Sequence, residues 1–294
     1  MNYIDHEKLA KRTKGRIRMN QVFKAMSLLA TLFGVLMLII LLVRVFSDGI
    51  GYISWDFLTG RLSTSAERAG IMGAILGSLW LIAVVTPVMM IIGIGTAVFI
   101  ELYMSAGRFR SLISLNIKNL AGVPSIVYGI LGLAIFVRAL HLGNVVLAGG
   151  LTIALLVLPI TIVATQEALR AIPGDLSDGA LGVGATKWQA IRTITLPAAL
   201  PSILTGAILA LSRAIGETAP LVVIGIPTLL LPFPGGIFDK FTVLPMQIYY
   251  WTLDSVLVAE YANLAAATII VLLVILFALN FIAVTIRRKF EISY

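Results

Sequence analysis

The stretch that decides the fold is residues 178–221, which read DGALGVGATKWQAIRTITLPAALPSILTGAILALSRAIGETAPL. Its first half is polar and amphipathic, whereas its second half is apolar and carries Arg213 and Glu217. A bilayer core about 30 Å thick requires about 20 apolar residues, so the second half is interpreted as a membrane span with two charges inside it. The first half is then a connector that precedes this span.

The composition of the whole chain favours a membrane protein. Its 294 residues are 59% hydrophobic and 12% charged, and its mean hydropathy is +1.02. A soluble protein of this size could not bury so much apolar surface, and the uniformly apolar segments lack the alternation of a β-barrel. The chain has no cysteine and two histidines, which excludes disulfides and disfavours a histidine-rich metal site. We therefore expect an all-α, polytopic membrane protein with no cofactor.

Six apolar runs predict six membrane spans, at about 26–46, 71–100, 120–140, 145–165, 202–224 and 262–286. They suggest a domain organisation with a basic N-terminal segment, a first span with its outer loop, a core that contains the connector 166–201, and a C-terminal tail. These parts are residues 1–25, 26–70, 71–286 and 287–294.

The distribution of basic residues predicts the orientation, because cytoplasmic segments are rich in lysine and arginine. With both termini in the cytoplasm, 16 of the 22 Lys and Arg lie in cytoplasmic segments and three lie in outer loops. This asymmetry explains the net charge of +8 without nucleic acid as a partner. The basic N-terminal segment would also contact lipid headgroups.

The connector has the pattern of two short helices joined by a glycine hinge. Residues 178–183 predict the first helix, which Gly182 and Gly184 end, and residues 187–192 predict the second. Residues 195–197, which include a proline, would end the second helix before the chain re-enters the membrane. Such a pair of helices forms either a knob for a groove on a soluble partner or a loop packed under its own bundle, and physical reasoning alone leaves both open.

The charged pair lies inside the fifth predicted span. Arg213 is expected near the bilayer centre, where inserting an arginine costs about 2.5–3.5 kcal/mol of free energy. It should therefore face the bundle interior and have a partner. Glu217 lies one helical turn further on the same face. Gly216 thins the helix between them, and Pro220 cannot donate a hydrogen bond to the Gly216 carbonyl. We therefore predict a hinge at Gly216 and Pro220, seen as a kink or local opening.

Three roles are open for this pair. Arginine suits an oxyanion because its planar fork donates two parallel hydrogen bonds, which favours an anion path. The pair could instead tie helices together, or take part in a proton relay, although one glutamate without an intramembrane histidine makes a poor relay. Arg138 and Arg170 are secondary candidates for anion contacts, and an interfacial topology charge is the simpler interpretation of each.

The connector resembles the coupling loop of ABC importer permeases, which has the pattern EAA-x3-G-x9-I-x-L-P. The spacing matches in full, with Asp in place of Glu and Gly in place of the first Ala. Gly179 weakens the short helix by about 1 kcal/mol relative to alanine. The resemblance implies that the ATPase-coupling residues are Asp178, Gly179, Ala180, Gly184, Trp188, Ile194, Leu196 and Pro197.

The stretch RAIGETAPL at 213–221 is similar to that of phosphate importer permeases of the PstA type, whereas the related PstC type usually has Met-Ala in place of Ala219-Pro220. The resemblance runs from about span two to span six and implies the type I ABC importer permease fold. It also implies a PstC-like second permease, a dimeric PstB-like ATPase and an extracytoplasmic PstS-like phosphate-binding protein in a bacterial inner membrane. By this resemblance Arg213 and Glu217 lie on the phosphate path.

Other classes of protein fit the sequence less well. It contains no Ser-His-Asp set and no GxxxxGK[ST] phosphate loop, so the chain is not expected to be an enzyme and must use the energy of a separate ATPase. Secondary transporters often have two similar halves, and no convincing internal repeat is present. An assembly subunit would leave Arg213 unexplained. An ABC permease for a related oxyanion and an ion-coupled secondary transporter remain as alternatives.

Overall fold

The computed structural model describes residues 6–227 and 233–289. Positions 1–5 and 290–294 of the predicted terminal segments 1–25 and 287–294 lie outside the described residues. The chain divides into two compact units, residues 1–48 and 49–294. The helix α1 (His6–Gly49) makes up most of the first unit and is longer than the predicted span 26–46. Most of its large apolar side chains between Ile17 and Phe46 are exposed.

The second unit is built from helices, and no strand forms within the described ranges, so the predicted all-α class is confirmed. Its elements up to the connector are η1 (Ile50–Tyr52), α2 (Trp55–Thr59), η2 (Ala66–Arg68), α3 (Met72–Val98), η3 (Phe99–Tyr103), α4 (Arg108–Leu120), α5 (Ser125–Gly132), η4 (Leu133–Ala139) and α6 (Val146–Arg170). The remaining elements are α7 (Gly174–Gly182), α8 (Lys187–Ala190), η5 (Ile191–Thr195), α9 (Leu196–Gly216), α10 (Ala219–Ile224), α11 (Leu244–Asp254) and α12 (Glu260–Lys289). The segments η3, η4 and η5 are π-helical.

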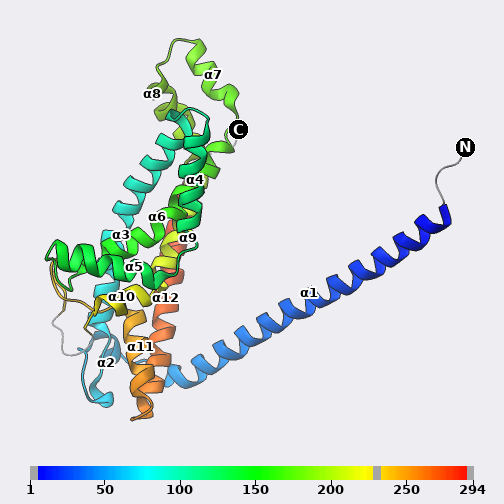
Figure 1. The fold of residues 1–294 in the computed structure, drawn as a ribbon. Coiled ribbons are helices and arrows are strands. Elements are labelled where there is room, and N and C mark those ends of the chain that lie inside the picture. The colour runs from blue at the N-terminus through cyan, green and yellow to red at the C-terminus, as the bar shows by residue number, and fades with distance from the viewer. Residues whose placement is uncertain (1–5, 228–232, 290–294) are drawn as a thin grey trace, which may run out of the picture. The chain divides into compact units, whose positions relative to one another are not determined.

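Five helical segments of the described chain are long and apolar enough to cross a membrane, and a bent pair of helices makes a sixth. This agrees with the predicted number of about six spans. In the second unit α3, α6, α9 and α12 run along one another, whereas the short helices α5 and α10 lie across them and α7 and α8 lie together at one end (Figure 1).

The third predicted span, 120–140, contains the continuous helix α5–η4, which is shorter than predicted and follows a sharp bend. The chain forms α4 in the region expected to be a loop and then bends by 98° into α5 and η4. The bend follows from the sequence between the two helices: backbone bonds from Gly122 and Val123 close a turn. Pro124 then disfavours helical geometry at the residue before it and starts the next helix.

The fifth predicted span is wrong at both ends. The helix does not stop at residues 195–197, because α8, η5 and α9 form one segment from Lys187 to Gly216. The π-helical segment η5 lies just before Pro197, which stands in the first turn of α9, where its missing N–H costs little. At the other end α9 stops at Gly216, and α10 is a separate helix.

The largest apolar core joins α3, α6, α9 and α10 to the segment that precedes α11. Leu221 in α10 and Phe241 before α11 are fully buried in this core. Helix α11 is anchored to a second apolar cluster, because Trp251 is buried against Phe57 and Tyr261. The short helix α10 is held in the largest core by the buried side chain of Leu221.

Helix α3 packs closely against the segment that precedes α11, and this approach depends on a glycine. A Cβ atom at Gly77 would overlap the carbonyl oxygen of Thr242, whereas nothing lies within 4 Å of a Cβ at Gly95, which is in the same helix. The backbone oxygen cannot move aside as a flexible side chain could. Gly77 is thus required by the approach of two segments far apart in the sequence.

We predict that Gly77→Ala destabilises the protein by about 1–3 kcal/mol, as overpacking of a close contact usually does. The measurement is the midpoint of thermal unfolding in detergent. Gly95→Ala is the matched control and should leave the midpoint unchanged or raise it, because alanine favours helix. Equal midpoints for Gly77→Ala and the unmodified protein would contradict the described contact.

Candidate functional site

The predicted pair forms at the end of α9, in its last turn. Arg213 Nε donates to Glu217 Oε1 at 3.1 Å. The expectation that both side chains lie buried inside this chain is wrong for the arginine, since 45% of its side chain and 18% of that of Glu217 is exposed. The pair therefore lies at the surface of this chain's own fold, within a helix long enough to span the membrane.

The helix is broken at this pair. Glu217 has an extended backbone (φ −78°, ψ 119°), and α10 begins two residues later with Pro220 in its first turn. The opening predicted for Gly216 and Pro220 is present as a complete break. A Cβ at Gly129 would lie 2.8 Å from the Cα of Pro220, so α5 and α10 touch through backbone and fix the far side of the break.

An apolar pocket of about 280 Å³ lies beside the break. Helices α5, α10 and α11 supply its lining, which consists of Ile126, Thr218, Ala219, Val222, Val223 and Tyr249. The pocket gives one wall of the break an apolar surface and leaves the charged pair on α9 as the polar element.

A hydrogen bond between α9 and α12 holds the neighbouring residue. Ser212 Oγ lies 2.8 Å from Asn280 Oδ1 and 2.9 Å from the carbonyl oxygen of Ile208. One hydroxyl proton can serve only one of these acceptors at a time, so the bond to Asn280 competes with the common back-bond to the preceding helical turn. Sequence reasoning missed Asn280, although an asparagine inside an apolar span is a visible signal.

The coupling-loop residues gather at the opposite end of this helix. Asp178, Gly179 and Ala180 lie in α7, Gly184 forms the turn, and Trp188 lies in α8. The remaining three matched residues, Ile194, Leu196 and Pro197, follow in η5 and the start of α9.

The turn between α7 and α8 has a defined geometry. Gly184 has a φ of +91°, and Thr186 and Gln189 form a reciprocal capping box at the start of α8. Trp188 is exposed on this hairpin, whereas Ile191, three residues further on, is buried. Leu181 and Val183, the latter 87% exposed, add to the apolar surface of the hairpin.

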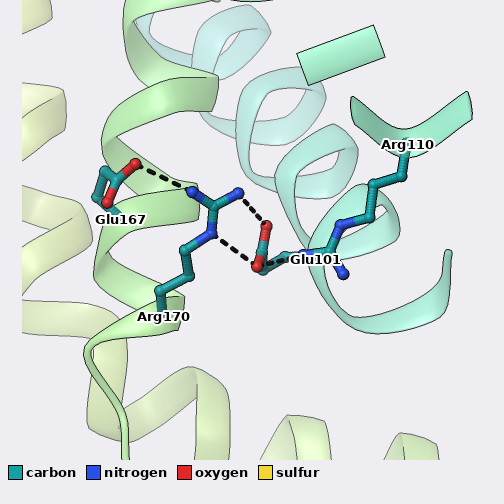
Figure 2. Close-up of polar contacts among 4 residues, drawn as sticks. All are labelled: Glu101, Arg110, Glu167 and Arg170. Atoms are coloured by element: carbon teal, nitrogen blue, oxygen red, sulfur yellow. Dashed lines mark hydrogen bonds and ion pairs between the residues drawn. The ribbon is translucent and has the colours of Figure 1, made fainter. Parts of the chain in front are cut away.

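A second charged cluster, in which only Arg170 was a candidate from the sequence, lies where η3, α4 and α6 meet (Figure 2). Glu101 accepts hydrogen bonds from Arg170 at 2.8 and 3.0 Å and also pairs with Arg110, while Arg170 reaches Glu167 at 3.2 Å. Arg170 is therefore neutralised by carboxylates and does not offer a free anion contact. No local pattern signals the cluster, since Glu101 and Arg170 are 69 residues apart.

The family described as "Binding-protein-dependent transport system inner membrane component" matches residues 89–292. The chain belongs to this family. It is therefore a multi-pass membrane subunit of an ABC importer, and the ATP-hydrolysing subunit is a separate protein. The family match covers the charged break, the coupling-loop hairpin and the cluster around Glu101.

Several relatives are similar over most of this permease. The phosphate transport system permease protein PstA of Yersinia pestis is 29% identical over 96% of the chain and 95% of its own length, and that of Haemophilus influenzae is 27% identical over 89% and 91%. The probable ABC transporter permease protein YqgI of Bacillus subtilis (strain 168) is 33% identical over 62% of the chain, and the match spans 63% of its length. These similarities make the chain a permease of the PstA type.

Solved structures confirm the permease fold. A bacterial ABC transporter involved in the import of the acidic polysaccharide alginate aligns with a TM-score of 0.66 at 17% identity, covering 95% of this chain and 99% of that one. The MetNI methionine ABC transporter, in an inward-facing conformation, aligns with a TM-score of 0.61 at 18% identity, covering 76% and 96%. The predicted ABC importer permease fold is therefore confirmed.

We predict that Gly184→Ala loosens the α7–α8 turn, because L-residues pay about 1–2 kcal/mol for left-handed backbone geometry. Trypsin cleavage after Lys187 in the detergent-solubilised protein should become roughly five- to thirtyfold faster, since cleavage follows the population of the opened segment. Gly182→Ala is the matched control: its φ is not positive and nothing lies near a Cβ there, so cleavage should not accelerate. Equal rates for the two variants would contradict this account of the turn.

Proposed function

We propose that this chain is the permease subunit of an ATP-driven phosphate importer, with Arg213 and Glu217 on the anion path. The observation that carries the proposal is the half-exposed ion pair at a break in a membrane-spanning helix. The two long PstA relatives, both phosphate transport system permeases, support phosphate as the substrate.

The hydrogen bonding of Arg213 suits a transient anion contact. Only its Nε atom bonds to Glu217, and within the part of the chain that the structure describes neither terminal nitrogen has a partner. These two nitrogens can donate to a passing oxyanion, for which the arginine fork is well shaped. Glu217 neutralises the arginine when no anion is present and repels phosphate, so the pair forms a contact that releases its ligand readily.

A second permease would cover the exposed side of this pair. An arginine in a membrane span avoids lipid and faces protein or a water-filled cavity, yet 45% of the Arg213 side chain is exposed in the isolated chain. A PstC-like permease facing the break would enclose it and place the anion path between the two subunits. The extended backbone at Glu217 has the same requirement, because irregular backbone within the membrane needs protein or water beside it.

The α7–α8 hairpin is the contact for a dimeric, PstB-like ATPase in this proposal. It presents Leu181, Val183 and Trp188 as exposed apolar side chains, which a groove on a soluble partner would cover. The matched coupling-loop residues, from Asp178 to Pro197, span this hairpin and the start of the next helix. Exposure of the apolar side chains thus favours a partner surface over a loop packed beneath its own bundle.

Alternating access follows from the continuous helix that links these two sites. Arg213 lies 26 residues beyond Lys187 in one helical segment, a distance of about 39 Å along the axis. When ATP closes the ATPase dimer around the hairpin, this helix tilts as a rod, while the break at Glu217 lets α10 stay packed against α5. An extracytoplasmic PstS-like protein delivers phosphate, and both termini of the permease lie in the cytoplasm, as the distribution of basic residues indicates.

One alternative substrate class fits the same geometry. A related oxyanion would use the same two arginine nitrogens, and the ion pair does not discriminate between tetrahedral anions of equal charge. Phosphate is preferred because the relatives that align over nearly the whole chain are PstA proteins. The ion-coupled secondary transporter is no longer an alternative, because the chain belongs to a family of ABC importer subunits.

We predict that Arg213→Gln lowers ATP-driven phosphate uptake in vesicles by about 10- to 100-fold, which corresponds to the 1.5–3 kcal/mol of hydrogen bonds to a charged group. The complex with the partner permease, ATPase and binding protein should still assemble, because the side chain is half-exposed and ties no second helix. Uptake of radiolabelled phosphate and co-purification of the subunits are the measurements.

The matched control is Arg44→Gln, which removes an arginine that is also paired one turn on, with Asp48 in α1 at 3.6 Å. Uptake by this variant should equal that of the unmodified complex. Undiminished uptake by Arg213→Gln, or loss of assembly in that variant alone, would make the pair at the break a structural one.

A further inference from the structure

Glu101 joins three segments of the permease core. It belongs to the π-helical turn η3, and 9% of its side chain is exposed. Arg170 Nε and Nη2 donate to its two carboxylate oxygens, and Arg110 at the start of α4 pairs with the same carboxylate (Figure 2). A single carboxylate therefore links the end of α3, the start of α4 and the end of α6.

The same turn holds both flanks of the α7–α8 hairpin. Arg170 is the last residue of α6, and α7 begins at Gly174. On the other flank the Lys187 ammonium lies 5.0 Å from the centre of the Tyr103 ring, a cation–π contact with the last residue of η3. The hairpin is thus attached before its first helix and at the start of its second to one five-residue turn.

Apolar packing also supports the turn η3. Ala168 and Leu169 of α6 and Ile203 of α9 form a small buried cluster. Side chains from the end of α3 and Leu102 of η3 pack against it. The turn is therefore held both by this apolar cluster and by Arg110 and Arg170. Motion of the end of α6, to which the hairpin is joined, relative to α3 and α4 would therefore have to break the bonds to Glu101.

The contact between Arg170 and Glu101 owes its strength to its geometry. Exposed ion pairs contribute little to stability, but the contact between Arg170 and Glu101 is two-pronged and its carboxylate is nearly enclosed, which gives it direction as well as energy. The contact between Arg170 and Glu167 is weaker, because 58% of the Glu167 side chain is exposed and only Nη1 of Arg170 reaches the carboxylate. Within the cluster Glu101 is the connecting residue and Glu167 is an accessory one.

We propose that Glu101 is a positioning residue for energy coupling: it transmits movement of the α7–α8 hairpin to α3 and α4. This inference rests on the proposed contact between the hairpin and an ATPase. The carboxylate itself touches neither ATP nor the transported anion, and it acts through Arg170 and Arg110. If it is removed, the hairpin and ATPase can still bind each other, but their movement no longer displaces the transport helices.

Glu101→Gln tests the proposal with little change of shape. In the full complex we expect assembly and ATP hydrolysis to persist while the phosphate moved per ATP falls by about fivefold or more, at the lower end of typical coupling between sites. Glu167→Gln is the matched control, the same chemical change on the same arginine, and its ratio should stay within twofold or so of the unmodified value. Arg170→Lys keeps the charge but loses the two-pronged contact, and should lower the ratio in the same direction if Glu101→Gln does not assemble.

A second readout does not depend on the substrate. The chain contains no cysteine, so Asp175→Cys in α7 and Leu115→Cys in α4 supply two unique sites, both exposed, for spin labels in a complex whose partners lack accessible cysteines. The distance distribution between them should stay narrow with and without ATP, because the link moves both elements together. Glu101→Gln should broaden it, and Glu167→Gln should not.

The outcomes separate this inference from the proposed function. An unmodified complex that moves no phosphate would overturn the substrate, and the spin-label distances would still decide the role of Glu101. If Glu101→Gln leaves both the phosphate moved per ATP and the distance distribution unchanged, the proposed role of Glu101 is wrong. A fall in assembly equal for Glu101→Gln and Glu167→Gln would assign the cluster to stability alone.

Discussion

One physical constraint governs the charged site: an arginine in a membrane-spanning helix must not face lipid. In this chain Arg213 lies in the last turn of α9, the backbone is broken at Glu217, and about half of the arginine side chain is exposed. Both the charge and the open backbone need protein or water beside them. The fold meets this need only in part, because α5, α10 and α11 build an apolar wall on one side. We propose that a partner subunit covers the other side, so that an incomplete site and a subunit role follow from the same constraint.

The break at Glu217 and the α7–α8 hairpin lie at the two ends of one helical segment, Lys187–Gly216. Because α8, η5 and α9 continue without interruption, displacement of the hairpin is carried along a single helix to the charged pair. Two features link this helix and the hairpin to the rest of the core. Glu101 ties the end of α6, just before the hairpin, to η3 and α4, and the bond between Ser212 and Asn280 ties α9 to α12. In the proposed mechanism, the break lets α9 tilt without displacing α10, whose Pro220 packs against Gly129. Anion transport and coupling to the ATPase would then use opposite ends of the same helical segment.

Sequence reasoning succeeded where the physics is local. Hydropathy predicted the number of spans, helical spacing predicted the bond between Arg213 and Glu217, and Pro220 predicted the opening beside them. It failed where distant segments decide the outcome. Glu101 has no local partner, because Arg170 is 69 residues away, and the exposure of Arg213 depends on how all the helices pack. Pro197 was interpreted as a helix end, but a proline in the first helical turn is compatible with a helix that arrives through a π-helical segment.

The most direct test of the central claim, that the break lines a water-filled path, is the reactivity of a cysteine at Gly216. The glycine is exposed, nothing lies within 4 Å of a Cβ there, and the chain has no other cysteine. In the assembled complex we predict that Gly216→Cys reacts with a charged, membrane-impermeant thiol reagent, because thiols ionise and react in water, and that phosphate and ATP change the rate. Reaction only with a lipid-soluble reagent, at a rate that neither ligand changes, would contradict the account.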